Sequence, residues 1–494
     1  MKFTRCPLRY GKSCGPNRRD FLAASAALVG SSSMLGGCAH VWSKGSPSTR
    51  IRPHGPATTY VPVVRAAFVR RGYPYGNRWP GAVYDGEAAR RKYTADLIEA
   101  AKAAGARLEL RPKPIYEFEE ADAWAAAAQA EAADGLVVML LDRQRHSWYT
   151  ATKAAETGIP TVIFSPVGTS FTTNTARLAD RQGCLIYSGE DFSQGAFGVK
   201  MLVAGARMRR CRCLVLKGEK RFDETMADTG ITLRYVPGTE LIDLYRRLPT
   251  GDEVRAMAAE YAKKAQKING PTRQDILNGA KFYFVASQML ETEQCDAITM
   301  DCLGTIGTSR NQVRDVSLPC LAWSRMNDDG IPAACEADTG AVAAHVITQY
   351  LFDRPGFQQD PVADTLHDAI IGAHCSCPTR LKGFDGPSEP FDIVHHHGMR
   401  DATPMVYWKK GQRITSFDVL PGDNTRPSKV LVHNGQVMGN VSVPPNGGCV
   451  ISVRVRFDGG HDVLTFPGFH QVFFYGDHKK QLTEFCRLFK LARA

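Results

Sequence analysis

The sequence lacks the short motifs that identify several large protein classes. No G-x-G-x-x-G or G-x-x-x-x-G-K-[ST] phosphate loop follows the first predicted strand, which disfavours a nucleotide cofactor. No G-x-S-x-G elbow occurs after residue 37, so Ser/His/Asp catalysis has no specific support. The closely spaced cysteines, 211 with 213 and 375 with 377, form C-x-C pairs and not C-x-x-C pairs. This spacing argues against a zinc ribbon or a thioredoxin-like centre.

The amino end carries the pattern of an export signal. It contains Asn17-Arg18-Arg19-Asp20-Phe21-Leu22, a twin-arginine pattern in which Arg18 and Arg19 would be read by the twin-arginine translocase. The apolar run that follows, 21–37, is too short and too rich in Gly, Ala and Ser for an ordinary membrane helix. It ends in Leu35-Gly36-Gly37-Cys38, which resembles a lipoprotein cleavage box.

We therefore expect residues 1–37 to be a signal peptide and Cys38 to carry a lipid that anchors the exported chain to a membrane, periplasmic or at the cell surface. The alternative is a plain cleaved signal followed by an unmodified cysteine. The twin-arginine route exports proteins that are already folded, and this suits a protein that receives a cofactor in the cytoplasm.

Charge and length constrain the exported part of the chain. Loss of residues 1–37 removes six basic residues and one acidic residue, so the formal charge falls from +11 to +6. This modest excess, without long Lys/Arg runs, does not indicate a nucleic-acid partner. Eleven cysteines remain after Cys38, an odd and scattered set that argues against a disulfide framework. More than 450 residues exceed one core, so two or three domains are expected.

Hydrophobic periodicity predicts two α/β domains after a tether at 38–58. In the first, 59–181, apolar runs such as 135–141 and 161–164 alternate with helical patterns such as 87–104, the signature of a buried parallel sheet covered by helices on both faces. The second, 182–354, is predicted to begin with a strand at 184–187. Residues just past the carboxyl ends of such strands contact ligands. This rule marks Asp142, Ser165, Lys217 and Asp301 as cleft candidates.

The pattern changes after Pro355. Short β-rich segments separated by Gly, Pro, Asn and Asp turns predict a β-sandwich or barrel over 355–494, with a final helix at 480–491. The expected fold class is therefore α/β: two doubly wound, Rossmann-like domains followed by a β-rich domain.

Three blocks in the last third of the chain carry metal-ligand chemistry. They are Cys335-Glu336-Ala337-Asp338, Gly372-Ala373-His374-Cys375 and Gly468-Phe469-His470-Gln471. Carboxylate and imidazole are the ligands that hold Mn²⁺, Mg²⁺ or Zn²⁺ while leaving positions for water or substrate. The competing interpretation is that these are ordinary core or surface polar residues. The run His395-His396-His397 is better explained as a solvated strand end, because successive strand residues point to opposite faces.

Two of these blocks resemble motifs of a known enzyme family. Gly372-Ala373-His374-Cys375-Ser376-Cys377-Pro378 resembles the G-[AS]-H-M-L-E-V-C-P segment of L-arabinose isomerases, with a contraction before Cys-Pro. The segment 468–473 resembles their G-A-H-H-T-V-F segment. Both matched histidines bind Mn²⁺ in that family, so the resemblance implies a metal site containing His374 and His470. It covers about residues 60–494, including the order of the three domains.

The carboxylate block resembles the E-x-D segment of the sister L-fucose isomerases, where the Asp is a metal ligand, whereas arabinose isomerases use a Glu. Glu336 and Asp338 are both candidate ligands on this basis. A departure occurs at Pro319. There the family helix, S-E-A-L-L-C-S-S-F-D-W-N-G, carries an acid. Aldose–ketose isomerisation needs a base to move a proton between adjacent carbons. The candidates to act as this base in place of the missing acid are Glu336, Asp338, Asp301 and Asp315.

Two functions follow from the resemblance as expectations. The first is an exported, lipid-anchored isomerase that interconverts aldoses and ketoses with a divalent metal, with Mn²⁺ preferred over Mg²⁺ or Zn²⁺. The second is a periplasmic carbohydrate-binding protein that kept the isomerase fold and lost turnover. Pro319 would explain this loss, because it replaces the family acid. The resemblance also implies a trimer or hexamer.

Overall fold

The computed structural model describes residues 55–72, 85–143, 145–307, 313–396, 400–422, 428–442 and 450–493. Residues 50–494 form one compact unit. The twin-arginine pattern, the cleavage box with Cys38 and His397 lie outside the described residues. No described helix is long and apolar enough to cross a membrane.

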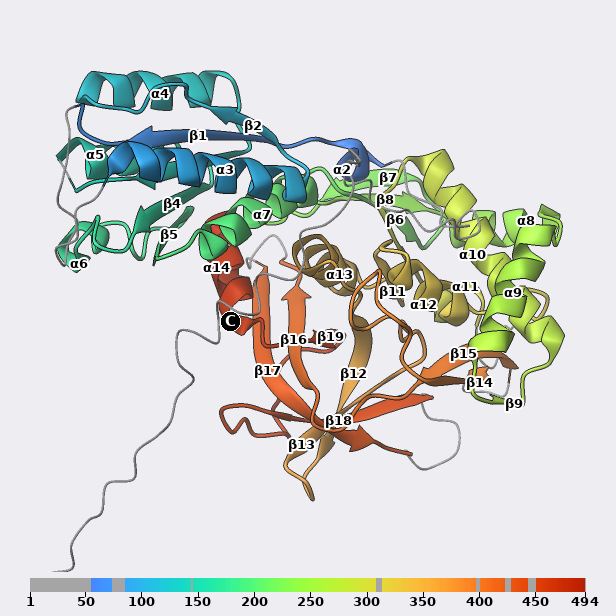
Figure 1. Cartoon of the computed structure of the whole chain (residues 1–494). Coiled ribbons are helices and arrows are strands. Elements are labelled where there is room, and N and C mark those ends of the chain that lie inside the picture. The colour runs from blue at the N-terminus through green and yellow to red at the C-terminus, as the bar shows by residue number, and fades with distance from the viewer. Residues whose placement is uncertain are drawn as a thin grey trace, which may run out of the picture. The chain divides into compact units, whose positions relative to one another are not determined.

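The first sheet is parallel, with the strand order β2-β1-β3-β4-β5 of a doubly wound fold (Figure 1). Its strands are β1 (Val63–Val69), β2 (Arg107–Leu110), β3 (Gly135–Leu140), β4 (Thr161–Pro166) and β5 (Cys184–Gly189). Its helices are α3 (Gly86–Ala104), α4 (Phe118–Ala130), α5 (Arg145–Glu156), the short α6 (Thr172–Thr175) and α7 (Ser193–Met208).

The apolar strands of this sheet are buried on both faces because helices cover each one. Val137 and Met139 of β3 pack in the cluster that contains α3 and α7. Leu136 and Val138 pack in the cluster that contains α4 and α5. The period-2 alternation of a strand therefore supplies two cores from one uninterrupted apolar run, as the sequence predicted.

The boundary between the first two predicted domains needs a correction. The strand predicted to open the second α/β domain is β5, and it pairs in parallel with β4 from Thr161↔Cys184 to Pro166↔Gly189. It therefore completes the first sheet. The apolar pattern identified the strand correctly, but pattern alone does not select its hydrogen-bonding neighbour.

The second sheet has the order β11-β10-β6-β8-β7, parallel except for the edge strand β7. Its strands are β6 (Arg212–Leu216), β7 (Phe222–Thr225), β8 (Thr232–Val236), β10 (Ala297–Met300) and β11 (Ala333–Cys335). Its helices are α8 (Gly238–Arg247), α9 (Asp252–Lys264), α10 (Arg273–Glu293), α11 (Cys302–Thr305), α12 (Cys320–Asp328) and α13 (Thr339–Phe352).

Part of the predicted tether is folded onto this sheet. The short helix α2 (Pro56–Thr59) begins there, and the backbone amides of Ala57 and Thr58 donate to the carboxylate of Asp296 at 3.1 and 2.9 Å. Ala57 is fully buried. The predicted end of the tether at residue 58 is therefore too late.

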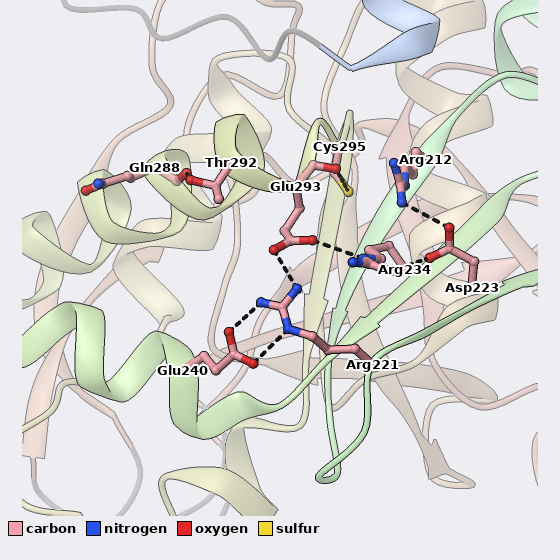
Figure 2. A network of polar contacts seen from close by, with 9 residues as sticks. All are labelled: Arg212, Arg221, Asp223, Arg234, Glu240, Gln288, Thr292, Glu293 and Cys295. Atoms are coloured by element: carbon pink, nitrogen blue, oxygen red, sulfur yellow. Dashed lines mark hydrogen bonds and ion pairs between the residues drawn. The ribbon is translucent and has the colours of Figure 1, made fainter.

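An ion-pair network ties the open edge of this sheet to its helices. Figure 2 shows Arg221 of the β6–β7 connection between Glu240 of α8 and Glu293 of α10. Arg234 of β8 contacts the other oxygen of Glu293 at 3.0 Å and also contacts Asp223 of β7. Most of these groups are partly exposed, so each pair contributes little on its own. The shared, nearly buried Glu293 couples them.

The carboxyl-terminal domain is a closed six-stranded antiparallel barrel with the order β16-β19-β12-β13-β18-β17, closed by pairing of β17 with β16. Its strands are β12 (Phe357–Asp364), β13 (Ala369–His374), β16 (Arg413–Leu420), β17 (Lys429–Asn440), β18 (Ile451–Phe457) and β19 (Gln471–Tyr475). This selects the barrel from the two predicted β architectures. Closure leaves these six strands without a free edge.

Two strands of this domain lie outside the barrel. The hairpin of β14 (Phe391–His396) and β15 (Arg400–Val406) joins β9 (Ile268–Asn269) in a separate three-stranded sheet. The terminal helix α14 (Lys479–Phe489) is followed by β20 (Ala492–Arg493), which pairs with β17. Because α14 contacts both β17 and β5, it links the barrel to the first sheet.

The contact between α7 and α14 requires a glycine. A Cβ atom on Gly205 would lie 1.9 Å from Cζ of the buried Phe489. We predict that Gly205→Ala lowers the free energy of unfolding by about 1–3 kcal/mol, because the new methyl group would overlap the Phe489 ring, which is buried beside Phe485 and Arg209. Urea denaturation of the full chain measures this change. The double variant Gly205→Ala/Phe489→Leu should lose less stability than the sum of the two single variants, because leucine removes the ring that the alanine methyl would meet. A loss equal to that sum would exclude the clash.

Candidate functional site

A strained turn after β11 presents Glu336. Glu336 and Ala337 both adopt the left-handed region, with φ of 62° and 52°, which is uncommon for residues other than glycine. The turn is held on both sides. The amide of Ala337 donates to the carbonyl of Met300 at 2.8 Å, and the amide of Cys335 donates to Oε1 of Gln358 in the barrel at 2.8 Å. Strain of this kind concentrates at functional sites.

The two predicted histidines come from the barrel and meet Glu336. His374 is the last residue of β13, and His470 immediately precedes β19; both are buried. Nε2 of His374 lies 3.9 Å from Oε1 of Glu336, and Nε2 of His470 lies 3.5 Å from Oε2. One ligand atom from each of the three residues can be chosen so that all lie within 4.8 Å of one another. The predicted blocks therefore converge, although they are far apart in sequence.

Asp360 joins this group and was missed by the sequence analysis. Gln359 of β12 pairs with Gln471 of β19, and Asp360 pairs with Ala373 of β13, so Asp360 stands between the strands that carry the two histidines. Its Oδ1 lies 3.0 Å from Nε2 of His470. Asp360 sits in an ordinary β segment without a recognisable motif. Only the register of the barrel brings it to the site.

Asp338 has a different role from Glu336. Its Oδ2 accepts a hydrogen bond from Nδ1 of His470 at 2.8 Å, and its Oδ1 accepts one from the amide of Ala341 at 2.8 Å as the N-cap of α13. With Nδ1 held by Asp338, Nε2 of His470 faces Glu336 and Asp360. Metal-ligating histidines are commonly oriented by a carboxylate in this way. The geometry favours Glu336 as the ligand and Asp338 as its support.

Burial and crowded charge perturb these groups. Burial raises the pKa of Glu336; the charge of His470 opposes this shift, while Asp360 and Asp338 reinforce it. Burial acts to lower the pKa of His470, but its contacts with Asp338 and Asp360 outweigh burial and raise the pKa to about 10. Burial also acts to raise the pKa of Asp338, yet the hydrogen bonds from His470 and Ala341 lower it overall.

A further buried carboxylate, Asp418 of β16, supports the segment that carries His470. Burial, followed by the negative charge of Asp338, raises the pKa of Asp418 to about 7. Gly468 has φ of 88°, and a Cβ there would lie 2.5 Å from Oδ2 of Asp418. Glycine therefore allows the chain to pass directly over this carboxylate before Phe469 and His470.

The other predicted site residues lie elsewhere or act indirectly. Asp301 is the N-cap of α11, accepting from the amide of Gly304 at 2.9 Å, and its charge reaches Glu336. Asp315 forms an exposed ion pair with Arg246 at 2.7 Å and does not belong to the site. Pro319 is buried as the N-cap of α12. Nδ1 of His395 contacts the backbone oxygen of Asp401 at 2.9 Å, and β14 ends at His396 as predicted, but His396 is buried and not solvated.

The residues present fit a divalent cation. Oδ1 of Asp360 and Nε2 of His470 are buried and close, yet neither has an aligned hydrogen-bond partner among the described residues. Glu336, Asp360, His374 and His470 would hold the ion, with Asp338 fixing one imidazole. Mixed carboxylate and imidazole ligands suit Mn²⁺ and Zn²⁺, and Mg²⁺ less well. The choice of Mn²⁺ stays a prediction.

Comparison of the chain with known protein families and with curated proteins finds no match.

We predict that the purified chain retains about one divalent ion after loading with Mn²⁺ and dialysis. His374→Ala and His470→Ala should each abolish retention, because each removes a ligand from a small set. Elemental analysis measures the content. His433→Ala is the matched control, since His433 contacts His461 and lies outside the cluster. Unchanged content in both site variants would exclude the metal centre.

The role of Asp338 has its own test. We expect Asp338→Asn to keep the α13 cap, because Asn is an equally good N-cap, and to weaken Mn²⁺ binding about 10-fold to 100-fold. Competition with a fluorescent chelator measures the affinity, and thermal unfolding of the metal-free chain checks the fold. An unaltered affinity would show that Asp338 does not orient His470.

Proposed function

We propose that this chain is an aldose–ketose isomerase-like enzyme that acts on a carbohydrate and depends on a divalent metal. One observation carries the proposal: two carboxylates, Glu336 and Asp360, lie 3.5 and 3.0 Å from the same imidazole nitrogen, Nε2 of His470. The proline in place of the family acid made the isomerase chemistry questionable. Asp360 supplies a second acid at the site from another element, so the chemistry does not depend on position 319.

The two carboxylates suit the proton movements of the reaction. Interconversion of an aldose and a ketose removes a proton from one carbon and returns it to the neighbouring carbon, while a hydroxyl proton also moves. Burial raises the pKa of Glu336 in the metal-free chain, and the charge of a bound cation would oppose this shift. We assign the carbon proton to Glu336 and the hydroxyl proton to Asp360. The divalent ion, when bound, supplies polarisation of the sugar oxygens.

Phe469 provides a surface for the substrate. Its side chain is 59% exposed, and its ring centroid lies 4.4 Å from that of His470. An exposed aromatic ring next to buried polar ligands is the combination that ligand sites use: apolar contact for affinity and a few polar groups for orientation. We assign the apolar C–H face of the sugar to Phe469.

Export and lipid anchoring are part of the proposal and rest on the sequence pattern at Arg18, Arg19 and Cys38. The ten described cysteines after that pattern are all buried and free. Buried reduced thiols are compatible with folding in the reducing cytoplasm before passage through the twin-arginine translocase. The trimer or hexamer implied by the family resemblance also stays a prediction.

A screen of aldoses and ketoses with the Mn²⁺-loaded chain tests the activity. We expect interconversion of at least one pair, and we expect Glu336→Gln and Asp360→Asn to lower kcat by about 10²-fold to 10⁴-fold, the usual contribution of a general acid or base. Asp243→Asn is the matched control, because Asp243 is an exposed surface acid of α8.

The same screen separates the two candidate functions when sugar binding is measured in parallel by calorimetry. Saturable binding without turnover would replace the enzyme by the carbohydrate-binding protein. Turnover that survives in both Glu336→Gln and Asp360→Asn would contradict the assignment of the carboxylates.

A further inference from the structure

A second cleft, of about 560 Å³, lies at the carboxyl end of the first sheet. It is bordered by the start of α4, by α5 and by the segment around α6 that follows β4. None of its lining residues belongs to the candidate metal site. In doubly wound sheets, ligands bind outside the carboxyl ends of the strands. A volume of this size falls in the range that holds a small organic molecule.

The residues predicted from this rule are not the ones that line the cleft. Asp142 is fully buried, and its carboxylate accepts from the amide of Arg71 and the hydroxyl of Ser147. The hydroxyl of Ser165 contacts Thr169 and Ser170. Both side chains therefore serve the local fold, and the cleft is formed by the residues beyond them.

The charge of the cleft is entirely positive. Arg143 and Arg177 are its charged lining residues, and no carboxylate lines it. The guanidinium of Arg143 lies 4.7 Å from the ring centroid of Phe171, which holds it in place. A guanidinium fixed in this way beside a cleft is suited to an oxyanion.

The cleft also has aromatic walls, and the side chain of Trp148 is one of them. The rings of Phe118 and Tyr149 pack edge to face with centroids 4.8 Å apart. The hydroxyl of Tyr149 donates to Asp122, and Nζ of Lys153 lies 5.2 Å from the centroid of its ring.

We propose that this cleft binds a small organic oxyanion with a ring or hydrocarbon body. Arg143 and Arg177 hold the carboxylate or phosphate group, and the body lies against the rings of Trp148 and Phe118. This site is independent of the metal cluster and of the sugar reaction proposed there.

Trp148 makes the binding measurable. Two ligands are titrated into the full chain: phenyl phosphate, a phenyl ring with a phosphate group, and benzoate, a phenyl ring with a carboxylate group. Inorganic phosphate is the control anion that lacks a hydrocarbon part. We expect saturable binding by calorimetry and a change in tryptophan fluorescence that is absent from Trp148→Phe. The stronger of the two ring compounds identifies the preferred oxyanion. Inorganic phosphate should bind at least about 10-fold more weakly, because it forgoes the apolar contact.

Substitution of the arginines tests the assignment. Arg143→Gln and Arg177→Gln should each weaken binding about 10-fold to 100-fold, the effect of losing a charged hydrogen bond. Arg181→Gln removes the same charge from an exposed position near the cleft and should leave binding within about twofold. Equal losses of binding affinity in all three variants would show that only general electrostatic attraction is involved, and this result would overturn the proposed site.

Absence of saturable binding by either ring compound up to about 10 mM would also overturn the proposal, because binding weaker than that is not specific recognition. Melting temperature and Mn²⁺ content are measured for every variant, and Trp148→Phe provides an independent test within the cleft if an arginine variant is unfolded. Loss of sugar turnover with intact anion binding would count against the metal-site function alone.

Discussion

The hydrogen bond between Nδ1 of His470 and Asp338 connects the barrel to the second α/β sheet at the point where the candidate chemistry occurs. It orients the imidazole of His470 so that Nε2 faces Glu336 and Asp360. Asp338 can take this role because it also caps α13, a helix buried along almost its whole length. One carboxylate thus fixes a helix end and an imidazole together.

The strained turn at Glu336 depends on the same arrangement. Two successive left-handed residues cost about 1–3 kcal/mol each, so the surrounding structure must hold them. The second sheet does so through Met300, the barrel does so through Gln358, and the buried α13 follows directly after the turn. A carboxylate that two domains hold in a strained turn has a defined position, which a ligand or catalytic group needs. The apolar cores offset the free-energy cost of this strain.

The two candidate ligand sites have opposite electrostatics. Around His470, the carboxylates of Glu336, Asp338 and Asp360 outnumber the two imidazoles, and this excess of acids suits a cation. In the cleft of the first sheet, Arg143 and Arg177 stand without a lining carboxylate, and aromatic rings replace the acids. The two candidate sites are built from different sheets.

The sequence alone determined the local elements and part of the candidate site. Uninterrupted apolar runs such as β3 identified buried parallel strands, and short glycine-containing motifs identified His374 and His470 as a pair. It did not determine that β5 belongs to the first sheet, that the β-rich domain closes as a barrel, or that Asp338 contacts Nδ1 of His470 while Glu336 faces Nε2. Asp360 had no signal in the sequence. Periodicity depends on neighbours a few residues apart, whereas pairing, register and the direction of an imidazole nitrogen depend on hydrogen bonds between residues more than a hundred positions apart.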